Sequence, residues 1–328
     1  MSRRTPTTRM LLAALAALAL FAAGCGSNDD EGSSGDSGGG AGEGEFTELD
    51  MSDVSITIGS KDFTENQVVA EIFAQSIEAA GGKVDRQINL GGTNVNREAL
   101  TSGQIDAYPE YNGTGWTVHL GHDDPGDDPE ALTEKTAAED LEANKIHWLG
   151  RSAFNNTYGF ATGPDLTDEN GGGFDLQGMA DYLKENPDAV ACMETEFPDR
   201  PDGLVLFEEA TGFKIPQNQQ SILDTGIIYN ETAQGNCQFG EVFTTDGRIP
   251  ALDLTVVDDG GAFILYNMSF TITDEAYQQA PEEFVQISEA ILNDLDDDTM
   301  ADLNKQVDVE GEEMDDVVKK YLVEQGLI

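Results

Sequence analysis

The stretch SITIGSKDFTENQ, residues 55–67, places a short β-branched run directly before a polar turn. Ser55–Ile58 favours a buried β-strand, and Lys61 follows at its carboxyl end, where open α/β sheets bind their ligands. Thr64 and Gln67 have the spacing of a capping box, which predicts that a helix starts here. We therefore expect a strand, a ligand-binding turn and a helix, with Lys61 as a candidate anion contact.

The following residues have helical periodicity. One face of the expected helix 64–80 is apolar, with Val68, Val69, Ile72, Phe73 and Ile77. Strands and helices then alternate, which is the pattern of an α/β lobe. The expected elements are strand 84–90, helix 94–102, strand 104–110, a short helix near 114–121, and helix 130–144.

A second α/β pattern follows the extended segment IHWLGRSAF, residues 146–154, which we expect to cross to a second lobe. Ile249–Leu254 is interpreted as the return crossing. Two crossings predict a hinge, with a central ligand cleft between the lobes. The predicted lobes are residues 53–150 plus 252–328, and residues 151–251.

The first residues predict export from the cytoplasm. Three arginines precede the apolar stretch Met10–Ala23, which is typical of a signal peptide over residues 1–24. Small residues directly before Cys25 predict lipidation of that cysteine, with an ordinary secretory signal as the alternative. Residues 25–52 are rich in Gly, Ser, Asp and Glu, so we expect a flexible acidic tether.

The charge balance excludes one class of partner. The chain has 63 acidic and 17 basic residues, a formal net charge of −46. Such a field repels nucleic acid and keeps a protein soluble, and we expect a monomer. His119 and His122 lie near Asp123 and Asp124, but such a loop is typically solvated, so no metal is predicted. No catalytic motif or cofactor fingerprint is present, and no enzyme activity or cofactor is expected.

Five motifs occur in an order that resembles one family, the substrate-binding proteins of osmoprotectant ABC importers for glycine betaine, choline, carnitine and proline betaine. The motifs are GSKDFTE at 59–65, LGGTNVNREAL at 90–100, DAYPEYNGTG at 106–115, EFPDRPDGL at 196–204 and FTTDGRI at 243–249. The resemblance runs from about Val54 to the C-terminus. It implies a two-lobe periplasmic-binding-protein fold, type II-like.

The resemblance also implies an aromatic cage, because a quaternary ammonium group cannot donate hydrogen bonds and is held by aromatic faces. The cage positions correspond to Tyr111, Tyr158 and Tyr266 in this sequence. Phe243 occupies the fourth cage position, where the family pattern has tyrosine. A phenyl ring offers the same π face without a hydroxyl, so the ligand preference at this position is open.

The carboxylate end of a betaine requires cationic or hydrogen-bonding groups. By the same resemblance, Lys61, Thr114 and Arg200 match the family positions for that role. Pro201 could begin a helix, which would hold Arg200 beside a helix N-terminus that attracts anions. A surface ion pair is the alternative role for Arg200.

With Cys25 lipidated, Cys192 and Cys237 remain as an even pair in an oxidising compartment. We expect a disulfide between them, with two buried free thiols as the alternative.

The sequence therefore predicts a lipid-anchored binding protein on the outer face of the cytoplasmic membrane or in the periplasm. It would capture a quaternary ammonium osmolyte, deliver it to a separate ABC permease and perform no chemistry. Choline, carnitine, another methylated amine or an amino acid are alternative ligands. A secreted enzyme or a sensor on the same scaffold is the alternative of another class.

Overall fold

The computed structural model describes residues 44–123 and 125–328. The expected signal peptide, Cys25 and most of the expected tether lie outside these residues. Within the described ranges, the strands form two five-stranded sheets. No helix in these ranges is long and apolar enough to cross a lipid bilayer.

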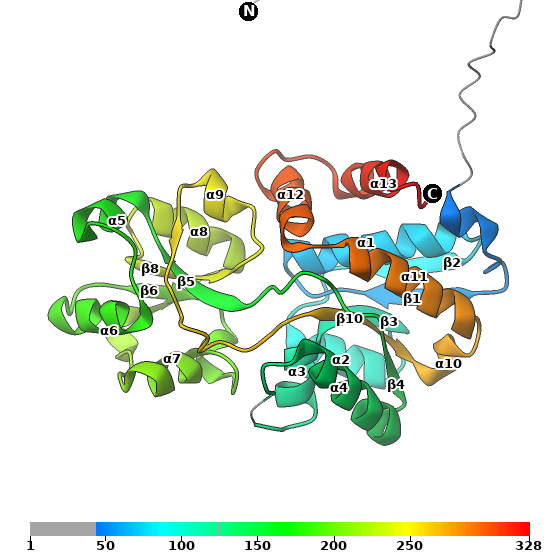
Figure 1. Ribbon diagram of the computed structural model, residues 1–328, viewed down its shortest axis with the longest axis horizontal. Helices are drawn as coiled ribbons and strands as arrows, with labels where there is room; N and C mark the ends of the chain where they lie inside the picture. Colours follow the sequence, from blue (N-terminus) through cyan, green and yellow to red (C-terminus); the bar gives the residue numbers. More distant parts are fainter. Residues whose placement is uncertain (1–43, 124) are drawn as a thin grey trace, which may run out of the picture. The chain divides into compact units, whose positions relative to one another are not determined.

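The first sheet has the strand order β2-β1-β3-β10-β4 (Figure 1). The strands β1, β2 and β3 are parallel, and β10 runs antiparallel to both β3 and β4. Because β10 comes from the last quarter of the chain, two distant segments build this lobe. The bounds are β1 Ser55–Gly59, β2 Lys83–Gln87, β3 Ala107–Tyr111, β4 Ile146–Leu149 and β10 Met268–Thr273.

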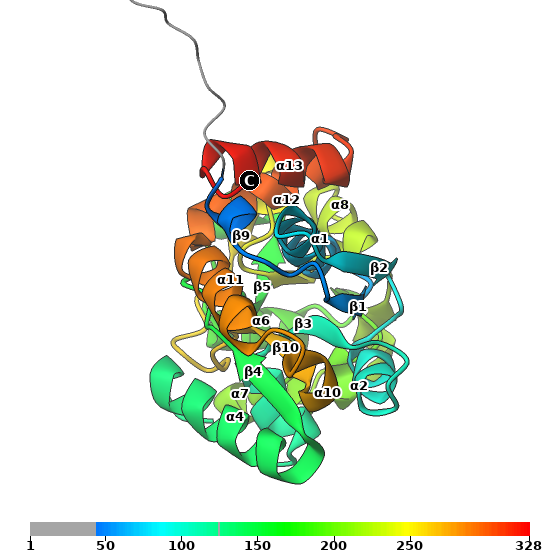
Figure 2. The same ribbon diagram turned by 90° about the vertical axis from the view of Figure 1, so that its right-hand side faces the viewer.

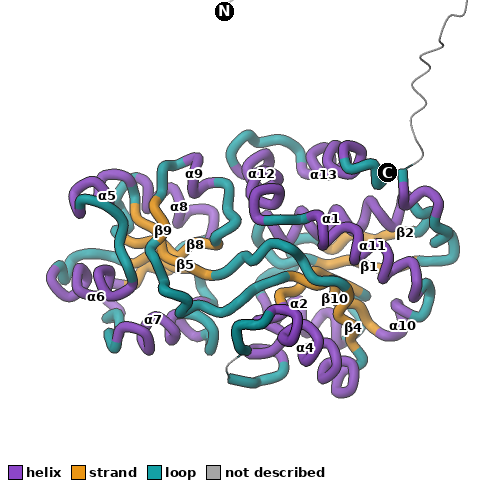
Figure 3. Tube along the Cα trace, viewed as in Figure 1, coloured by secondary structure: helices purple, strands orange, loops and turns teal. Residues whose placement is uncertain are grey.

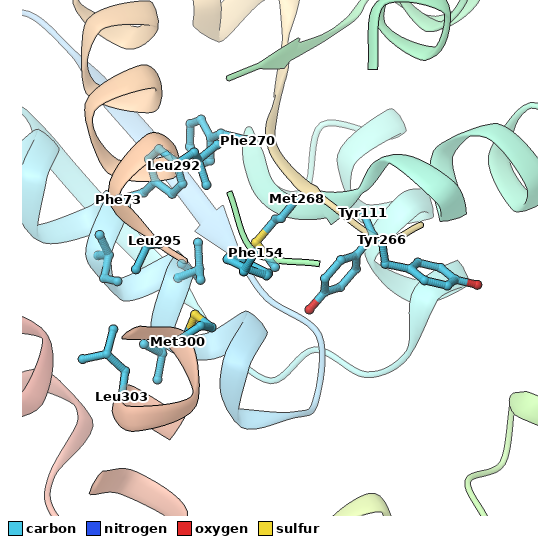
Figure 4. Close-up of a cluster of buried hydrophobic side chains, with 14 of the residues drawn as sticks. Phe73, Tyr111, Phe154, Tyr266, Met268, Phe270, Leu292, Leu295, Met300 and Leu303 are labelled. Carbon is cyan, nitrogen blue, oxygen red and sulfur yellow. The ribbon is translucent and has the colours of Figure 1, made fainter. Parts of the chain in front are cut away.

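Helices cover both faces of this sheet, with α1 and α2 on opposite sides (Figure 2). The predicted apolar face of α1 is buried, and Phe73 stacks on Phe270 of β10 with ring centroids 4.0 Å apart (Figure 4). The helices are η1 Glu45–Glu48, α1 Thr64–Ala79, α2 Thr93–Thr101, α3 Asn112–Thr114, a π-helical turn Gly115–His119, α4 Pro129–Asn144, α10 Asp274–Tyr277, α11 Pro281–Asp294, α12 Asp297–Asp308 and α13 Met314–Glu324.

The second sheet has the order β7-β6-β8-β5-β9. The strands β6, β7 and β8 are parallel, whereas β5 is antiparallel to β8 and β9. Its strands are β5 Tyr158–Thr162, β6 Ala191–Met193, β7 Gln220–Ile222, β8 Phe239–Phe243 and β9 Thr255–Val256. Its helices are α5 Pro164–Asn170, α6 Leu176–Glu185, η3 Phe197–Asp199, α7 Leu204–Thr211, η4 Gln217–Gln219, α8 Thr225–Ala233 and α9 Arg248–Ala251.

The chain passes between the sheets twice, once between β4 and β5 and once between β9 and β10, and Figure 3 shows both connections as loops. The connections are hydrogen-bonded to each other, since Ser152 N donates to Met268 O and Asn267 Nδ2 donates to Phe154 O. The predicted α/β, two-lobe architecture with two crossings is confirmed.

The predicted return crossing at Ile249–Leu254 is wrong, and with it the boundary of the second lobe at residue 251. Residues 248–251 form α9, and β9 pairs with β5 in the second sheet. Leu254 is buried in the core of that lobe, where Ile249 also packs. The apolar run therefore serves the second lobe, and the return connection begins after β9.

Two local predictions near the N-terminus also need correction. The expected tether does not extend to residue 52, because Phe46 and Met51 are buried and Phe46 N donates to Leu327 O near the C-terminus. The capping box is absent, since Phe63 is the N-cap of α1 and Thr64 Oγ1 donates to Asp308 of α12. In both places the side chains contact residues that are far away in sequence, and local spacing cannot reveal such contacts.

A disulfide joins Cys192 of β6 to Cys237, which lies just before β8. Both cysteines are buried, and β6 and β8 are neighbours in the sheet. The bridge closes a sequence separation of 45 residues.

Loss of this bridge should destabilise the protein measurably. Cross-linking a loop of this length stabilises by about 4 kcal/mol in the chain-entropy model. We expect a Cys192→Ser/Cys237→Ser variant to show a free energy of unfolding in urea that is lower by about that amount. In a Cys25→Ser variant, two alkylatable thiols in the denatured but unreduced protein would contradict the bridge.

Candidate functional site

A cleft of about 710 Å³ is lined by residues of both lobes. It contains side chains from the carboxyl ends of β1, β3, β6 and β8 and from the two connections, the position at which α/β folds bind ligands. Of the residues predicted for the site, those that line the cleft are Lys61, Tyr111, Thr114, Tyr158, Phe243 and Tyr266.

Aromatic side chains form a closed circuit in this cleft, which we call the five-ring cluster: Phe63, Tyr111, Tyr266, Tyr158 and Phe243. Neighbouring ring centroids around the circuit are separated by 6.2, 6.2, 5.3, 5.4 and 5.1 Å, the last distance closing it from Phe243 back to Phe63. The structure thus brings the four predicted aromatic residues together and adds Phe63.

The backbone explains how rings distant in sequence meet. Tyr111 is the last residue of β3, whereas Tyr158 and Phe243 face each other across the antiparallel pair β5 and β8. Tyr266 lies in the second connection beside Tyr111 (Figure 4). A Cβ at position 113 would lie 2.5 Å from Leu265 O, so Gly113 is required for this close approach.

Cations of the protein itself already lie against two of these rings. Lys61 Nζ is 5.3 Å from the Tyr111 centroid, and the Arg200 guanidinium carbon is 5.6 Å from the Tyr158 centroid. Both distances are within the range of cation–π attraction. The five-ring cluster is therefore next to a positively charged cluster, and the cleft has one aromatic end and one polar end.

Threonine hydroxyls connect the two cations of the polar end. Lys61 Nζ and Arg200 Nη1 both donate to Thr93 Oγ1, at 3.2 and 2.9 Å, and Arg200 Nη2 donates to Thr114 Oγ1 at 3.1 Å. Each hydroxyl accepts from a cation and keeps its own hydrogen to donate. Thr93 and Thr114 line the cleft, so these donors can reach an anionic ligand group.

Both cations also have carboxylate partners. Lys61 pairs with Glu110 at 2.6 Å, and Arg200 binds both oxygens of Asp202, at 2.8 and 2.7 Å. Burial alone would raise the pKa of Glu110, but the charge of Lys61 and the hydrogen bond with His119 lower it below its usual value. Glu110 is therefore ionised, and the ion pair with Lys61 is formed.

Arg200 differs from its predicted setting in two ways. It is buried and does not line the cleft, since Thr93 and Thr114 accept its hydrogen bonds from the cleft side. It also does not lie at a helix N-terminus, because α7 begins at Leu204 and Arg200 instead follows the short helix η3. The alternative role as a surface ion pair does not fit a buried guanidinium.

Sequence reasoning missed two residues that line the cleft, Phe63 and Thr93. Both lie inside the motifs GSKDFTE and LGGTNVNREAL, and that position was the signal that could have identified them. The two histidines near the acidic loop have separate partners: His119 contacts Glu110, and His122 contacts Glu139.

Two carboxyl groups lie close together on the second lobe. Glu241 Oε2 accepts from the backbone N–H of Glu194, which lines the cleft. Glu241 is buried, and within the described chain its Oε1 accepts no hydrogen bond. Burial, with the nearby charge of Glu194, raises the pKa of Glu241 well above its usual value.

This raised pKa should make stability depend on pH. The side chain of an unfolded Glu titrates at about pH 4.3. Above that pH the native state, in which Glu241 keeps its proton, binds more protons than the unfolded state. The free energy of unfolding therefore falls as pH rises. We expect Glu241→Gln to flatten this decline between about pH 5 and 8 in urea unfolding, because the amide cannot ionise. Glu169→Gln, at an exposed position on α5, is the control. The same decline in Glu241→Gln and in the native protein would contradict the assignment.

The comparisons with known proteins agree with this geometry. The family model described as the substrate-binding domain of an ABC-type glycine betaine transport system matches residues 54–324. A glycine-betaine-binding protein of Pseudomonas aeruginosa is 34% identical over 281 residues, 84% of this chain and 89% of that protein. A carnitine transport binding protein of Listeria monocytogenes is 28% identical, over 82% of this chain and 86% of that protein.

The glycine betaine-binding protein YehZ of Escherichia coli is 31% identical over 83% of this chain and 90% of that protein. The solved structure of apo YehZ aligns with a TM-score of 0.61 at 30% identity, covering 84% of this chain and 99% of that one. The resemblance inferred from the motifs is thereby confirmed. The chain belongs to the family of substrate-binding domains of ABC-type glycine betaine transport systems.

Proposed function

We propose that this protein captures a quaternary ammonium osmolyte of the glycine betaine type in the cleft between its lobes. The five-ring cluster would hold the methylated nitrogen, and the threonine hydroxyls would bind the carboxylate. The observation that carries the proposal is the closed circuit of rings directly beside the Lys61, Thr93 and Arg200 cluster.

The aromatic end suits a cation without hydrogen-bond donors. A trimethylammonium group cannot form a directed salt bridge, but its charge is attracted to the faces of aromatic rings. Buried tyrosines add no competing negative charge, because burial raises the pKa values of Tyr158 and Tyr266 well above their usual value. The rings therefore remain neutral π surfaces.

The polar end suits a carboxylate held through hydroxyl groups. Thr93 and Thr114 accept from the cations and can donate to the ligand, so the charges of Lys61 and Arg200 act partly through them. Aromatic contacts at about 0.5–2 kcal/mol each and two or three charge-assisted hydrogen bonds at about 1.5–3 kcal/mol each support micromolar binding, near −8 kcal/mol.

A ligand without a carboxylate, such as choline, is the second candidate. The specific observation in its favour is that Lys61 and Arg200 are already paired with Glu110 and Asp202. A cation with a neutral hydroxyl could therefore bind without leaving a buried positive charge unpaired. Phe243 stands where the family pattern has tyrosine, so the aromatic end has one hydroxyl fewer. This difference also affects the choice between glycine betaine and choline.

Members of this family bind substrates for ABC transport, so the chain is a binding protein rather than an enzyme. Its partners are a small-molecule ligand and, by this proposal, the permease of an ABC importer. The predicted signal peptide and Cys25 support a location outside the cytoplasmic membrane with a lipid anchor, and the high negative charge supports a monomer.

The two ends of the ligand should give two different mutational signatures in calorimetric titrations. Tyr158→Ala should weaken glycine betaine and choline alike, by about 1–2 kcal/mol for a desolvated cation–π contact. Arg200→Ala should cost glycine betaine about 2 kcal/mol or more and leave choline nearly unaffected, because choline has no carboxylate. Phe243→Tyr should have a small effect.

Exposed Lys184→Ala, which also removes one positive charge, is the matched control for Arg200→Ala. Equal losses of both ligands in Arg200→Ala would contradict the assignment of the two ends. Binding of choline without any binding of glycine betaine would replace the first candidate by the second.

A further inference from the structure

Glu65 is a buried carboxylate that is hydrogen-bonded to one ring of the five-ring cluster. It is the second residue of α1 and only 4% exposed. Tyr111 Oη and Asn156 Nδ2 donate to its Oε1, at 2.7 and 2.8 Å, and Thr245 Oγ1 and Asn304 Nδ2 donate to its Oε2, at 2.5 and 3.2 Å.

These contacts connect the carboxylate to the segments that carry the rings. Tyr111 is itself a ring of the cluster, and Phe63 lies two residues before Glu65. Asn156 lies two residues before Tyr158, and Thr245 lies two residues after Phe243. The remaining ring, Tyr266, is tied to the same place because its carbonyl accepts from the backbone N–H of Asn156.

None of the ion pairs among residues 44–123 and 125–328 includes Glu65. Its carboxylate therefore has no cationic partner in these ranges. Burial raises the pKa of Glu65 above its usual value, and the hydrogen bonds from Thr245, Tyr111, Asn156 and Asn304 oppose that rise. Hydrogen bonds donated by all four partners favour the carboxylate form. Burial and the charge of Glu65 also raise the pKa of Tyr111, which therefore stays a phenol and donates.

The other charged groups on the surrounding elements pair with one another. Arg248 of α9 binds Asp246, and it also lies 3.3 Å from Asp308 of α12. An isolated buried carboxylate is costly unless a positive charge approaches it. A cationic ligand group inside the five-ring cluster would supply that charge, because Tyr111 of the cluster is hydrogen-bonded to Glu65.

We propose that Glu65 is a positioning and charge-sensing residue for the ligand: its carboxylate holds the ring-bearing segments together and supplies the negative charge by which the five-ring cluster distinguishes a cation from a neutral group of the same shape. This inference rests on the proposed function. A tyrosine that donates to an anion also carries more electron density on its ring, which strengthens attraction to a cation.

The test compares two ligands that differ in charge at one atom. Glycine betaine carries a trimethylammonium group, and 3,3-dimethylbutanoate has a tert-butyl group in its place with the same carboxylate. Calorimetric titration of the purified full chain should show a preference for glycine betaine. Glu65→Gln should lower that preference about fivefold or more, because it removes a buried negative charge that is bonded to one ring of the cluster, in a medium of low dielectric constant.

Two variants separate charge from structure. Thr245→Val removes one hydrogen bond to the carboxylate but keeps the charge, so both ligands should weaken by the same factor. Glu65→Asp keeps the charge on a shorter side chain and should retain the preference while weakening both ligands. An unchanged preference in Glu65→Gln, or equal loss of preference in all three variants, would overturn the proposal.

Glu65→Gln has a route to a folded state, because Asn304 Oδ1 is buried and without a hydrogen-bond partner in the described chain and could accept from the new amide. If circular dichroism shows that this variant is unfolded, the preference for glycine betaine is measured in Tyr111→Phe instead. That substitution removes the hydroxyl that links the ring to the carboxylate. A reduced preference then supports the proposal, and an unchanged preference overturns it.

The outcomes also separate this inference from the proposed function. Failure of the native chain to bind glycine betaine or choline would overturn the proposed function, and this inference with it. Native binding with a clear preference for the cation, unchanged in Glu65→Gln, would overturn only the role of Glu65.

Discussion

A quaternary ammonium ion offers neither a donor nor an acceptor, so only π faces and negative charge can hold it, and this constraint explains the site. The rings must surround the ion, and no single segment of chain can supply them. In this protein they come from the ends of β3, β5 and β8, the N-cap of α1 and the second connection. The double passage between the sheets brings these five positions together.

The polar half of the cleft follows from the same need to bury charge without leaving it unpaired. Lys61 and Arg200 are nearly inaccessible and are balanced by Glu110 and Asp202. Their hydrogen bonds to Thr93 and Thr114 convert two buried cations into oriented hydroxyl donors at the surface of the cleft. Such a surface can bind a carboxylate, yet neither cation is left unpaired when no ligand is bound.

Much of the scaffold could be predicted because its signals are local. The apolar face of α1 and the alternation of strands and helices required only residues within a few positions of each other. The return crossing was misplaced because an apolar run such as Ile249–Leu254 has the same pattern in a connection and in a lobe core. Phe46 and Met51 were assigned to a tether because their burial depends on distant contacts.

The site was predictable only where a motif carried it. Family resemblance identified seven residues that the structure brings together: Tyr111, Tyr158, Phe243, Tyr266, Lys61, Thr114 and Arg200. Glu65 could not be recognised in this way, since its partners Thr245 and Asn304 are 180 and 239 residues away in sequence. The role proposed for it depends on packing between both lobes, which no local pattern encodes.

The measurement that tests the central claim most directly is a calorimetric titration of the native protein with glycine, N-methylglycine, N,N-dimethylglycine and glycine betaine. All four are zwitterions with the same carboxylate, and each step replaces one N–H group by a methyl group against the five-ring cluster. The account predicts that affinity rises at each step, by about fourfold per buried methyl group, and that glycine betaine binds most tightly. Equal affinities across the series, or tighter binding of glycine, would contradict it.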